Sequence, residues 1–280
     1  MKRIVLPMLV MVCFLVSNAY ARTYTVTVNQ FVEHPALDAI LKGFQDSLRD
    51  NKVDVNYTIH NAQANMGTAT QIAKQMIGEQ ADLLVAIATP SAQAVAQANA
   101  KAPRNLQRPF LFTGVTDPVA AGLVKDIKMP GGNTTGVSDL LPLKEHLKMV
   151  LTYKPGIKRL GLLYNAGEAN SRANLLGIKK IGKELGFKVV EATASKTADV
   201  FQAAKSLVGR VDAVFIPTDN TIISALEAVL KIGAQNSLPV FCADVDSVKR
   251  GAVAALGFDY YKHGYQTGFI ARRILEGEKP

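Results

Sequence analysis

The residues with the clearest potential for chemistry lie where a short apolar run meets a helical pattern. Residues 83–88 read LLVAIA, which is too short for an independent helix and typical of a strand buried on both faces of a parallel sheet. Thr89, Pro90 and Ser91 follow, and this order predicts a helix that Thr89 caps and Pro90 opens. Free N–H groups at such a helix start suit an anion such as a carboxylate.

The same unit occurs a second time, with a carboxylate in its polar turn. Residues 211–230 align without a gap with residues 81–100, and Thr218, Asp219 and Asn220 form the turn. An aspartate there could accept charge-assisted hydrogen bonds from a ligand ammonium. We expect this aspartate, of all the candidates, to contact the ligand; the alternative is that it only caps the following helix, because capping and ligand binding use the same geometry. Two such units suggest two similar lobes whose ligand edges face each other.

Polar side chains also follow the other predicted strands, and in open α/β sheets ligands bind at that edge. The candidate ligand-binding residues are Glu33, His34, Thr89, Ser91, Thr116, Asp117, Ser138, Tyr164, Asn165, Asn170, Ser171, Thr218, Asp219, Asn220 and Asp244. Hydroxyls together with carboxylates favour a zwitterionic amino acid over a phosphate or a metal. Several candidates have a purely structural alternative. Thr89 and Ser171 could be only helix caps, Asp117 a turn residue, and His34 a helix-start residue.

The elements needed to position these residues alternate as in a doubly wound parallel α/β sheet. Strands are predicted at 24–32, 53–60, 83–88, 109–115, 159–164, 187–192, 211–216 and 239–243. Helices are predicted at 36–49, 67–78, from 89 onward, and at 119–124, 143–151, 171–185, 199–208 (capped by Thr197), 221–232 and 264–275. The alternation restarts near Gly136, which predicts two Rossmann-like lobes, 22–137 and 138–250. We expect segment 251–280, with a strand-like AVAALGF, to return to the first lobe.

The first residues have the pattern of a cleaved export signal. A basic pair, a short apolar core and the A-x-A site Ala19-Tyr20-Ala21 predict that residues 1–21 are a signal peptide. The mature chain would then begin at Arg22 in the periplasm. Cys242 is its only cysteine, so no intramolecular disulfide is expected.

Composition and motifs argue against several function classes. The formal net charge is +9, but the lysines are scattered over amphipathic helices, which argues against nucleic-acid binding. The sequence has no G-x-S-x-G, H-E-x-x-H or P-loop motif, so no catalytic residues are predicted. Its 4 histidines lack metal-ligand spacing, and neither a metal nor a cofactor is expected. The absence of Trp weakens sugar binding, although Phe31, Tyr164 and Tyr260 could still stack on a sugar.

Five short motifs stand in order along the mature chain. They are QFVEHPALDA from Gln30, TPSA from Thr89, TGVTDP from Thr113, GVS from Gly136 and GFDYY from Gly257. Together they resemble the substrate-binding proteins of bacterial ABC transporters, including tryptophan/tyrosine-type binders with a type I periplasmic-binding-protein fold. The resemblance implies two lobes that close about a hinge on a small ligand and deliver it to a permease in the inner membrane. An aromatic or large apolar amino acid is the expected ligand, and a monomer without catalysis the expected form.

Other functions remain open from the sequence. A ligand sensor that feeds a chemoreceptor or another signalling partner would leave no distinguishing motif, and a sugar or nucleoside remains an alternative ligand. The effector lobe of a transcription repressor shares this fold, but the signal peptide argues against it. An exported enzyme is disfavoured because no nucleophile–base pair is recognisable. The abrupt end at Pro280, without the family's closing strand and helix, indicates a truncated sequence.

Overall fold

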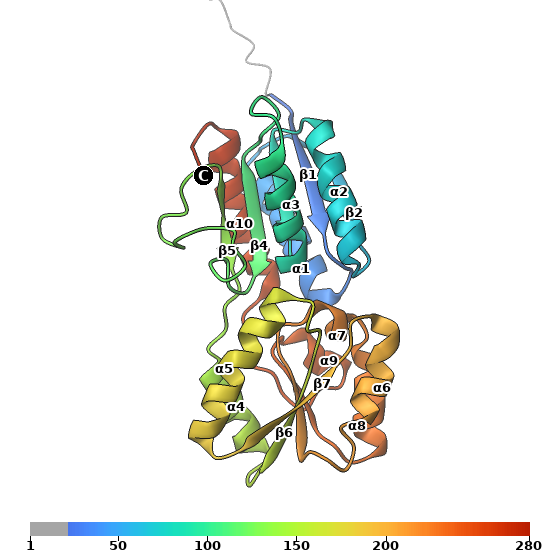
Figure 1. Ribbon diagram of the computed structural model, residues 1–280. Helices are drawn as coiled ribbons and strands as arrows, with labels where there is room; N and C mark the ends of the chain where they lie inside the picture. Colours follow the sequence, from blue (N-terminus) through green and yellow to red (C-terminus); the bar gives the residue numbers. More distant parts are fainter. Residues whose placement is uncertain (1–21) are drawn as a thin grey trace, which may run out of the picture.

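The computed structural model describes residues 22–280, which form two stacked α/β lobes (Figure 1). The predicted signal peptide, residues 1–21, lies outside the described residues. Within residues 22–280, none of the helices has both the length and the apolar character that a membrane span requires.

The first lobe is built on a five-stranded parallel sheet. Its strands are β1 (Tyr24–Gln30), β2 (Val55–Asn61), β3 (Leu83–Ile87), β4 (Phe110–Val115) and β5 (Thr134–Ser138), in the order β2-β1-β3-β4-β5. The central strands β3 and β4 are buried along their whole length, as expected for apolar strands between two layers of helices. The arrowheads of β1 and β4 point toward the second lobe, so the polar strand ends face it (Figure 1).

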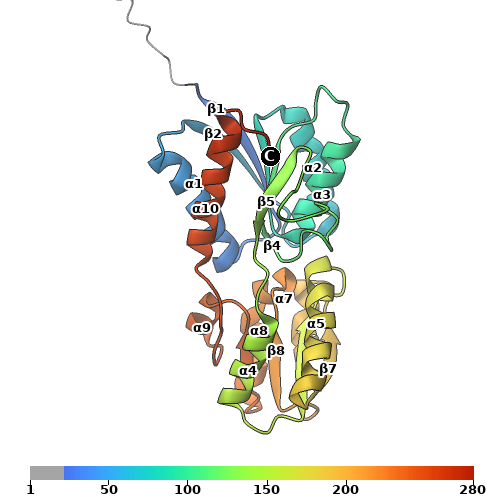
Figure 2. The same cartoon turned by 90° about the vertical axis from the view of Figure 1, so that its left-hand side faces the viewer.

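Helices cover both faces of this sheet. One face carries α2 (Met66–Glu79) and α3 (Thr89–Lys101), and the other carries α1 (Pro35–Asp50) and α10 (Tyr260–Leu275) (Figure 2). Although α10 comes from the end of the chain, its apolar side chains belong to the same buried core as β1 and β3.

The second lobe has a four-stranded parallel sheet. Its strands are β6 (Arg159–Tyr164), β7 (Lys188–Thr193), β8 (Ala213–Ile216) and β9 (Val240–Cys242), in the order β7-β6-β8-β9. Its helical segments are α4 (Leu143–Tyr153), α5 (Ala169–Leu185), η1 (Thr197–Asp199), α6 (Val200–Lys205), α7 (Asn220–Ser224), α8 (Leu226–Gln235) and α9 (Asp246–Arg250). Leu147 of α4 and Ile178 of α5 belong to one buried core, whereas Val200 of α6 and Val229 of α8 belong to another. This sheet therefore also lies between two helix layers.

The fold class predicted from the sequence is confirmed, with local differences. Residues 119–124 form a turn and not the predicted helix, and Gly122 within it has a φ of +75°. The predicted strand in segment 251–258 is reduced to one bridge between Cys242 and Ala255. The predicted helix 221–232 is broken at Ala225, where the backbone leaves the helical region (φ −118°, ψ 27°).

A second group of differences concerns helix starts. Thr197 does not cap the helix that follows it; it is the first residue of the 3-10 turn η1, whose cap position is Lys196. The short helix α9 was not predicted, because an isolated turn of this length has no recognisable apolar period.

Helices α1 and α10 approach each other closely because glycines lie in their contact. A Cβ atom added to Gly264 would overlap the carbonyl oxygen of Ile40, and one added to Gly43 would overlap that of Tyr261. At Gly268 the added atom would collide with the side chain of Ser47. Protein interiors are close-packed, so a larger residue at these positions forces the two helices apart.

We expect Gly264→Ala to lower the free energy of unfolding by about 1–3 kcal/mol, the usual cost of overpacking a tight contact. Gly78→Ala in α2 is the matched control, since no atom lies within 4 Å of the Cβ it would add. Alanine has the higher helix propensity, so this control should gain up to about 1 kcal/mol. Urea unfolding of both variants provides the measurement, and equal effects at the two sites would contradict the close-packing explanation.

Candidate ligand-binding site

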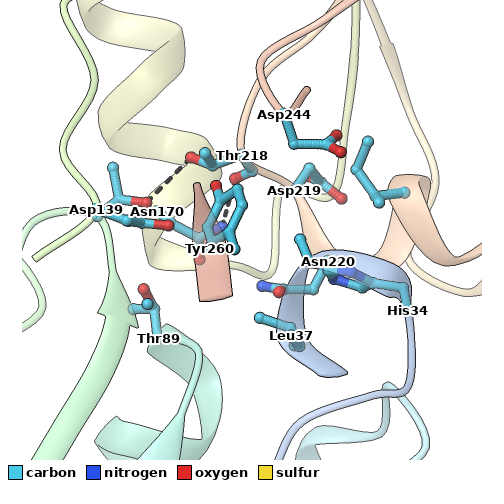
Figure 3. A pocket seen from close by; sticks show the side chains of 14 residues that line it. His34, Leu37, Thr89, Asp139, Asn170, Thr218, Asp219, Asn220, Asp244 and Tyr260 are labelled. Atoms are coloured by element: carbon cyan, nitrogen blue, oxygen red, sulfur yellow. Dashed lines mark hydrogen bonds between the residues drawn. The ribbon is translucent and has the colours of Figure 1, made fainter. Parts of the chain in front are cut away.

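A cavity lies between the two lobes, where the polar strand ends of both sheets meet (Figure 3). Its lining residues are His34, Ala36, Leu37, Thr89, Gly114 and Thr116 from the first lobe, Asn170, Thr218, Asp219, Asn220, Ile223 and Asp244 from the second, and Asp139 and Tyr260 from the segments where the chain crosses. The hydroxyls of Thr116 and Thr218 form a 3.0 Å hydrogen bond between the lobes. The lobes are therefore closed over the cavity.

Buried polar atoms without hydrogen-bond partners gather in this cavity. They are both ring nitrogens of His34, Oγ1 of Thr89, Oδ1 of Asp139 and Oδ1 of Asn170. Each of these side chains is at most 7% exposed, and each lines the cavity. An unpartnered buried polar group costs about 1–3 kcal/mol, so native proteins keep few of them. Their concentration in one cavity indicates a site built for a ligand that supplies the missing partners.

His34 reaches the cavity from the segment between β1 and α1. It occupies the cap position of α1 with an extended backbone (φ −161°, ψ 159°), but its side chain makes no capping hydrogen bond. Burial lowers the pKa of His34 to about 4, so the imidazole is neutral at pH 7. A neutral imidazole has one N–H donor and one acceptor nitrogen.

Thr89 faces the cavity because the backbone turns sharply at Ala88. Ala88 has φ +78° and ψ 153°, a conformation that is nearly restricted to glycine and costs about 1–3 kcal/mol. The turn is held by hydrogen bonds from Ala88 N to Thr113 O and from Ala92 N to Ala88 O, both 3.0 Å. The prediction that Thr89 caps α3 is wrong, since Ala88 holds the cap position and Thr89 is the first helical residue.

In the second lobe, the buried carboxylate of Glu168 positions the polar turns. Its Oε1 accepts hydrogen bonds from the backbone N–H and the hydroxyl of Thr221, at 3.0 and 2.8 Å. Its Oε2 accepts from the side-chain amides of Asn170 and Asn220, at 3.0 and 2.6 Å. The carboxylate of Glu168, which the solvent does not reach, thus orients the cavity residues Asn170 and Asn220.

Asp219 caps α7, one of the two roles that the sequence allowed. Its Oδ1 accepts a 2.9 Å hydrogen bond from the N–H of Ile222. Its Oδ2 accepts from the N–H of Asn165 and the hydroxyl of Ser171, at 2.6 and 2.5 Å. Burial and the neighbouring Glu168 raise the pKa of Asp219. Because both oxygens already accept protein hydrogen bonds, Asp219 has little capacity left for a ligand.

Asp139 is the carboxylate of the cavity that retains an unpartnered oxygen. It directly follows β5 and is 5% exposed, and this burial raises its pKa to about 6. Asp244 differs, because its two oxygens accept hydrogen bonds from the N–H and the hydroxyl of Ser247. Asp139 was not among the predicted site residues, although it follows the end of a strand as several of the predicted residues do.

The cavity brings together eight of the predicted site residues: His34, Thr89, Thr116, Asn170, Thr218, Asp219, Asn220 and Asp244. It also contains residues that were not predicted to bind ligand: Ala36, Leu37, Gly114, Asp139 and Ile223. Tyr260 lines it too, a residue considered only as a stacking surface for a sugar. The apolar members of this set could not be recognised from the sequence, because nothing distinguishes a cavity-lining Leu from a core Leu.

The other predicted site residues lie away from the cavity: Glu33, Ser91, Asp117, Ser138, Tyr164, Asn165 and Ser171. Asn165 and Ser171 lie one layer behind it, where they donate to Asp219. Glu33 is exposed, and the hydroxyl of Ser138 donates to a backbone carbonyl.

The remaining predicted site residues form hydrogen bonds with neighbouring side chains or backbone groups. The hydroxyl of Ser91 donates to Asn29 at 2.8 Å, and that of Tyr164 donates to Glu191 at 2.6 Å. Asp117 accepts from the backbone N–H groups two and three residues further along, which makes it a turn residue. Across residues 22–280, no cluster of three or more His, Cys, Asp or Glu side chains could hold a metal ion.

Two α/β lobes closed over a cavity with unpartnered polar atoms define a two-lobed solute-binding protein. The model of the family described as ABC transporter substrate binding protein matches residues 25–280, and the chain belongs to this family. The resemblance inferred from the sequence motifs is thereby confirmed.

Similar proteins include binders of aromatic amino acids. A tyrosine-binding protein of Clostridioides difficile (strain R20291) is 39% identical over 257 residues, which cover 90% of this chain and 73% of the relative. The structure of an ABC domain in complex with L-Trp from Streptococcus pneumonia is 32% identical, with a TM-score of 0.87 over 92% of this chain and 87% of that one.

A third comparison bears on the arrangement of the lobes. The ligand-free, open structure of a substrate binding protein with adhesive properties from Clostridium difficile is 39% identical and covers 91% of this chain and 86% of that one. Its TM-score is only 0.64, below that of the less similar L-Trp complex. The present structure as a whole therefore superposes better on the ligand complex than on the open, ligand-free structure. Ligand binding by closure about a hinge is typical of this fold.

We expect Ala88→Gly to raise the free energy of unfolding by about 1 kcal/mol, because glycine adopts the φ of +78° without strain. The matched control is Ala96→Gly in the interior of α3, where glycine should cost about 1 kcal/mol. Denaturant unfolding of the two variants should give changes of opposite sign. A loss of stability in Ala88→Gly as large as in the control would show that the turn stores no strain.

Proposed function

We propose that this protein binds an aromatic amino acid between its lobes in the periplasm and delivers it to an ABC permease, without catalysis of its own. The observation that carries the proposal is the set of unpartnered buried polar atoms around one interlobe cavity. Removal of residues 1–21 as a signal peptide and a monomeric mature protein form part of the same proposal.

The start of α3 suits the carboxylate of the ligand. Helix starts have N–H groups without intrahelical partners and a partial positive charge. The first turn of α3 contains no acidic residue that would compete for these groups. The hydroxyl of Thr89, which has no partner, and that of Thr116 lie in the same wall of the cavity.

Asp139 and Asn170 suit the ammonium group. Each presents one unpartnered Oδ1 to the cavity, and both oxygens can only accept hydrogen bonds. Among the described residues that line the cavity there is no lysine or arginine, so a cation meets no opposing positive charge. Asp139 and Asn170 lie side by side, with Thr89 on the same side of the cavity (Figure 3). The ammonium and the carboxylate of one α-amino acid could therefore bind together here.

The rest of the lining suits an apolar side chain. Leu37, Ile223 and the ring of Tyr260 supply apolar surface from three elements of both lobes. Relatives that are a tyrosine-binding protein and an L-Trp complex support an aromatic side chain in this part. Contacts from both lobes exist together only in the closed form, so the ligand shifts the population toward closure.

Calorimetric titration of residues 22–280 with amino acids, sugars and nucleosides tests the proposal. L-Tyrosine or L-tryptophan should bind, whereas their methyl esters and N-acetyl derivatives should bind far more weakly, because each lacks one of the two charges. The ligand should be recovered chemically unchanged. A sugar or nucleoside as the only binder would overturn the amino-acid assignment. Uptake of the labelled amino acid by cells with and without the protein separates delivery to a permease from a sensory role.

Affinity should depend on pH through Asp139. The ligand ammonium favours the ionised carboxyl, whose pKa is about 6, so binding weakens as the pH falls through this value. We expect affinity about tenfold lower at pH 5 than at pH 8. Asp139→Asn should lose roughly thirtyfold or more in affinity and most of this pH dependence. Titrations at several pH values test both points.

The matched control for this experiment is Asp117→Asn. Asp117 precedes the crossover in sequence and was also a candidate ligand residue, but it lies in a turn off the cavity. Its variant should keep the affinity and the pH profile of the unchanged protein. Equal losses in the Asp117 and Asp139 variants would contradict the assignment of the ammonium to Asp139.

A further inference from the structure

The side of the cavity opposite Asp139 contains a hydrogen-bonding group that a plain phenyl ring could not use. Figure 3 shows Asp139 and Asn170 on one side, and His34 with Leu37 on the other. If the ligand's charged groups bind beside Asp139, its side chain extends toward His34. The chemistry of His34 then decides which rings the site prefers.

His34 is buried at 7% exposure, and neither of its ring nitrogens has a hydrogen-bond partner. The imidazole is neutral, so it offers one donor and one acceptor at the same place. Such a ring can accept a hydrogen bond from an indole N–H, and it can donate to or accept from a phenol hydroxyl. A phenyl ring satisfies neither nitrogen and leaves both buried without a partner.

Two other polar side chains on this side of the cavity already form hydrogen bonds within the protein. The side-chain amide of Asn220 donates to Glu168 at 2.6 Å. Both carboxylate oxygens of Asp244 accept hydrogen bonds from Ser247. Leu37 and Ile223 provide only apolar contact. Among the described residues of this side, His34 is the one with two buried polar atoms that lack a hydrogen-bond partner, and it can serve a polar atom on the ligand's ring.

We propose that His34 selects aromatic amino acids that carry a hydrogen-bonding group on the ring, a phenol or an indole, over phenylalanine. This inference rests on the proposed binding of an aromatic amino acid in the same cavity. A site built to hydrogen-bond a ligand group rejects the analogue that lacks this group, because its own buried polar atoms are then left unpaired. His34 is a specificity-determining residue in this sense.

The test is calorimetric titration of L-tyrosine, L-tryptophan and L-phenylalanine into the unchanged protein and two variants. The unchanged protein should bind tyrosine, tryptophan or both at least about fivefold more tightly than phenylalanine, the lower limit for one unpaired buried group. His34→Leu should abolish this preference, mainly by losing affinity for the polar rings. His34→Gln, which keeps a donor and an acceptor, should retain part of it. Separate results for tyrosine and tryptophan show which polar ring the site uses.

Glu33→Gln provides the control, since Glu33 is the exposed neighbour of His34 and should leave all affinities unchanged. Equal binding of all three amino acids by the unchanged protein would overturn the role of His34 but leave the proposed function intact. A preference for the polar rings that persists in His34→Leu would also overturn the role of His34. If none of the three bound, the proposed function would fail and this inference with it. Melting curves confirm that each variant is folded, and the preference of the unchanged protein is decisive even if one variant is not.

Discussion

The ligand cavity depends on the buried carboxylate of Glu168 more than on any other single group in the second lobe. A charge without solvent contact is tolerated only when hydrogen bonds compensate for its lost hydration. Thr221, Asn170 and Asn220 supply these bonds, and in doing so they fix the start of α7 and two residues that line the cavity. Asp219 lies beside Glu168 and ties the same turn to the end of β6. This side of the cavity is therefore held in place by hydrogen bonds within the protein.

The first lobe supplies the complementary wall by different means. The strained backbone at Ala88 turns the start of α3 so that Thr89 lines the cavity, and the neutral ring of His34 enters from the start of α1. Helix α1 is held in place by its close contact with α10. The glycines in this contact allow the two backbones to approach. Tyr260, the first residue of α10, reaches the cavity for the same reason. Two walls that meet only when the lobes close are what a hinge mechanism needs.

Much of the fold was predictable because it follows from local patterns. Apolar runs such as β3 and β4 are too short for independent helices and favour buried strands, and their alternation with helices implies parallel sheets. The site was only partly predictable, since a position after a strand fixes the sheet edge but not the direction of the side chain. Ser91 and Tyr164 occupy such positions, yet each turns toward a neighbouring side chain. Asp139 was missed although its neighbour Ser138 was a candidate, because the end of a strand does not show which of two adjacent side chains enters the cavity.

The central claim is that the ligand completes the hydrogen bonds of the unpartnered cavity atoms. A crystal structure of the complex with the tightest-binding amino acid tests it most directly. The account predicts the ammonium within about 3 Å of Oδ1 of both Asp139 and Asn170. It also predicts the carboxylate at the start of α3 beside Thr89, and the side chain directed toward His34. A ligand bound outside this cavity, or inside it with these atoms still unpartnered, would contradict the account.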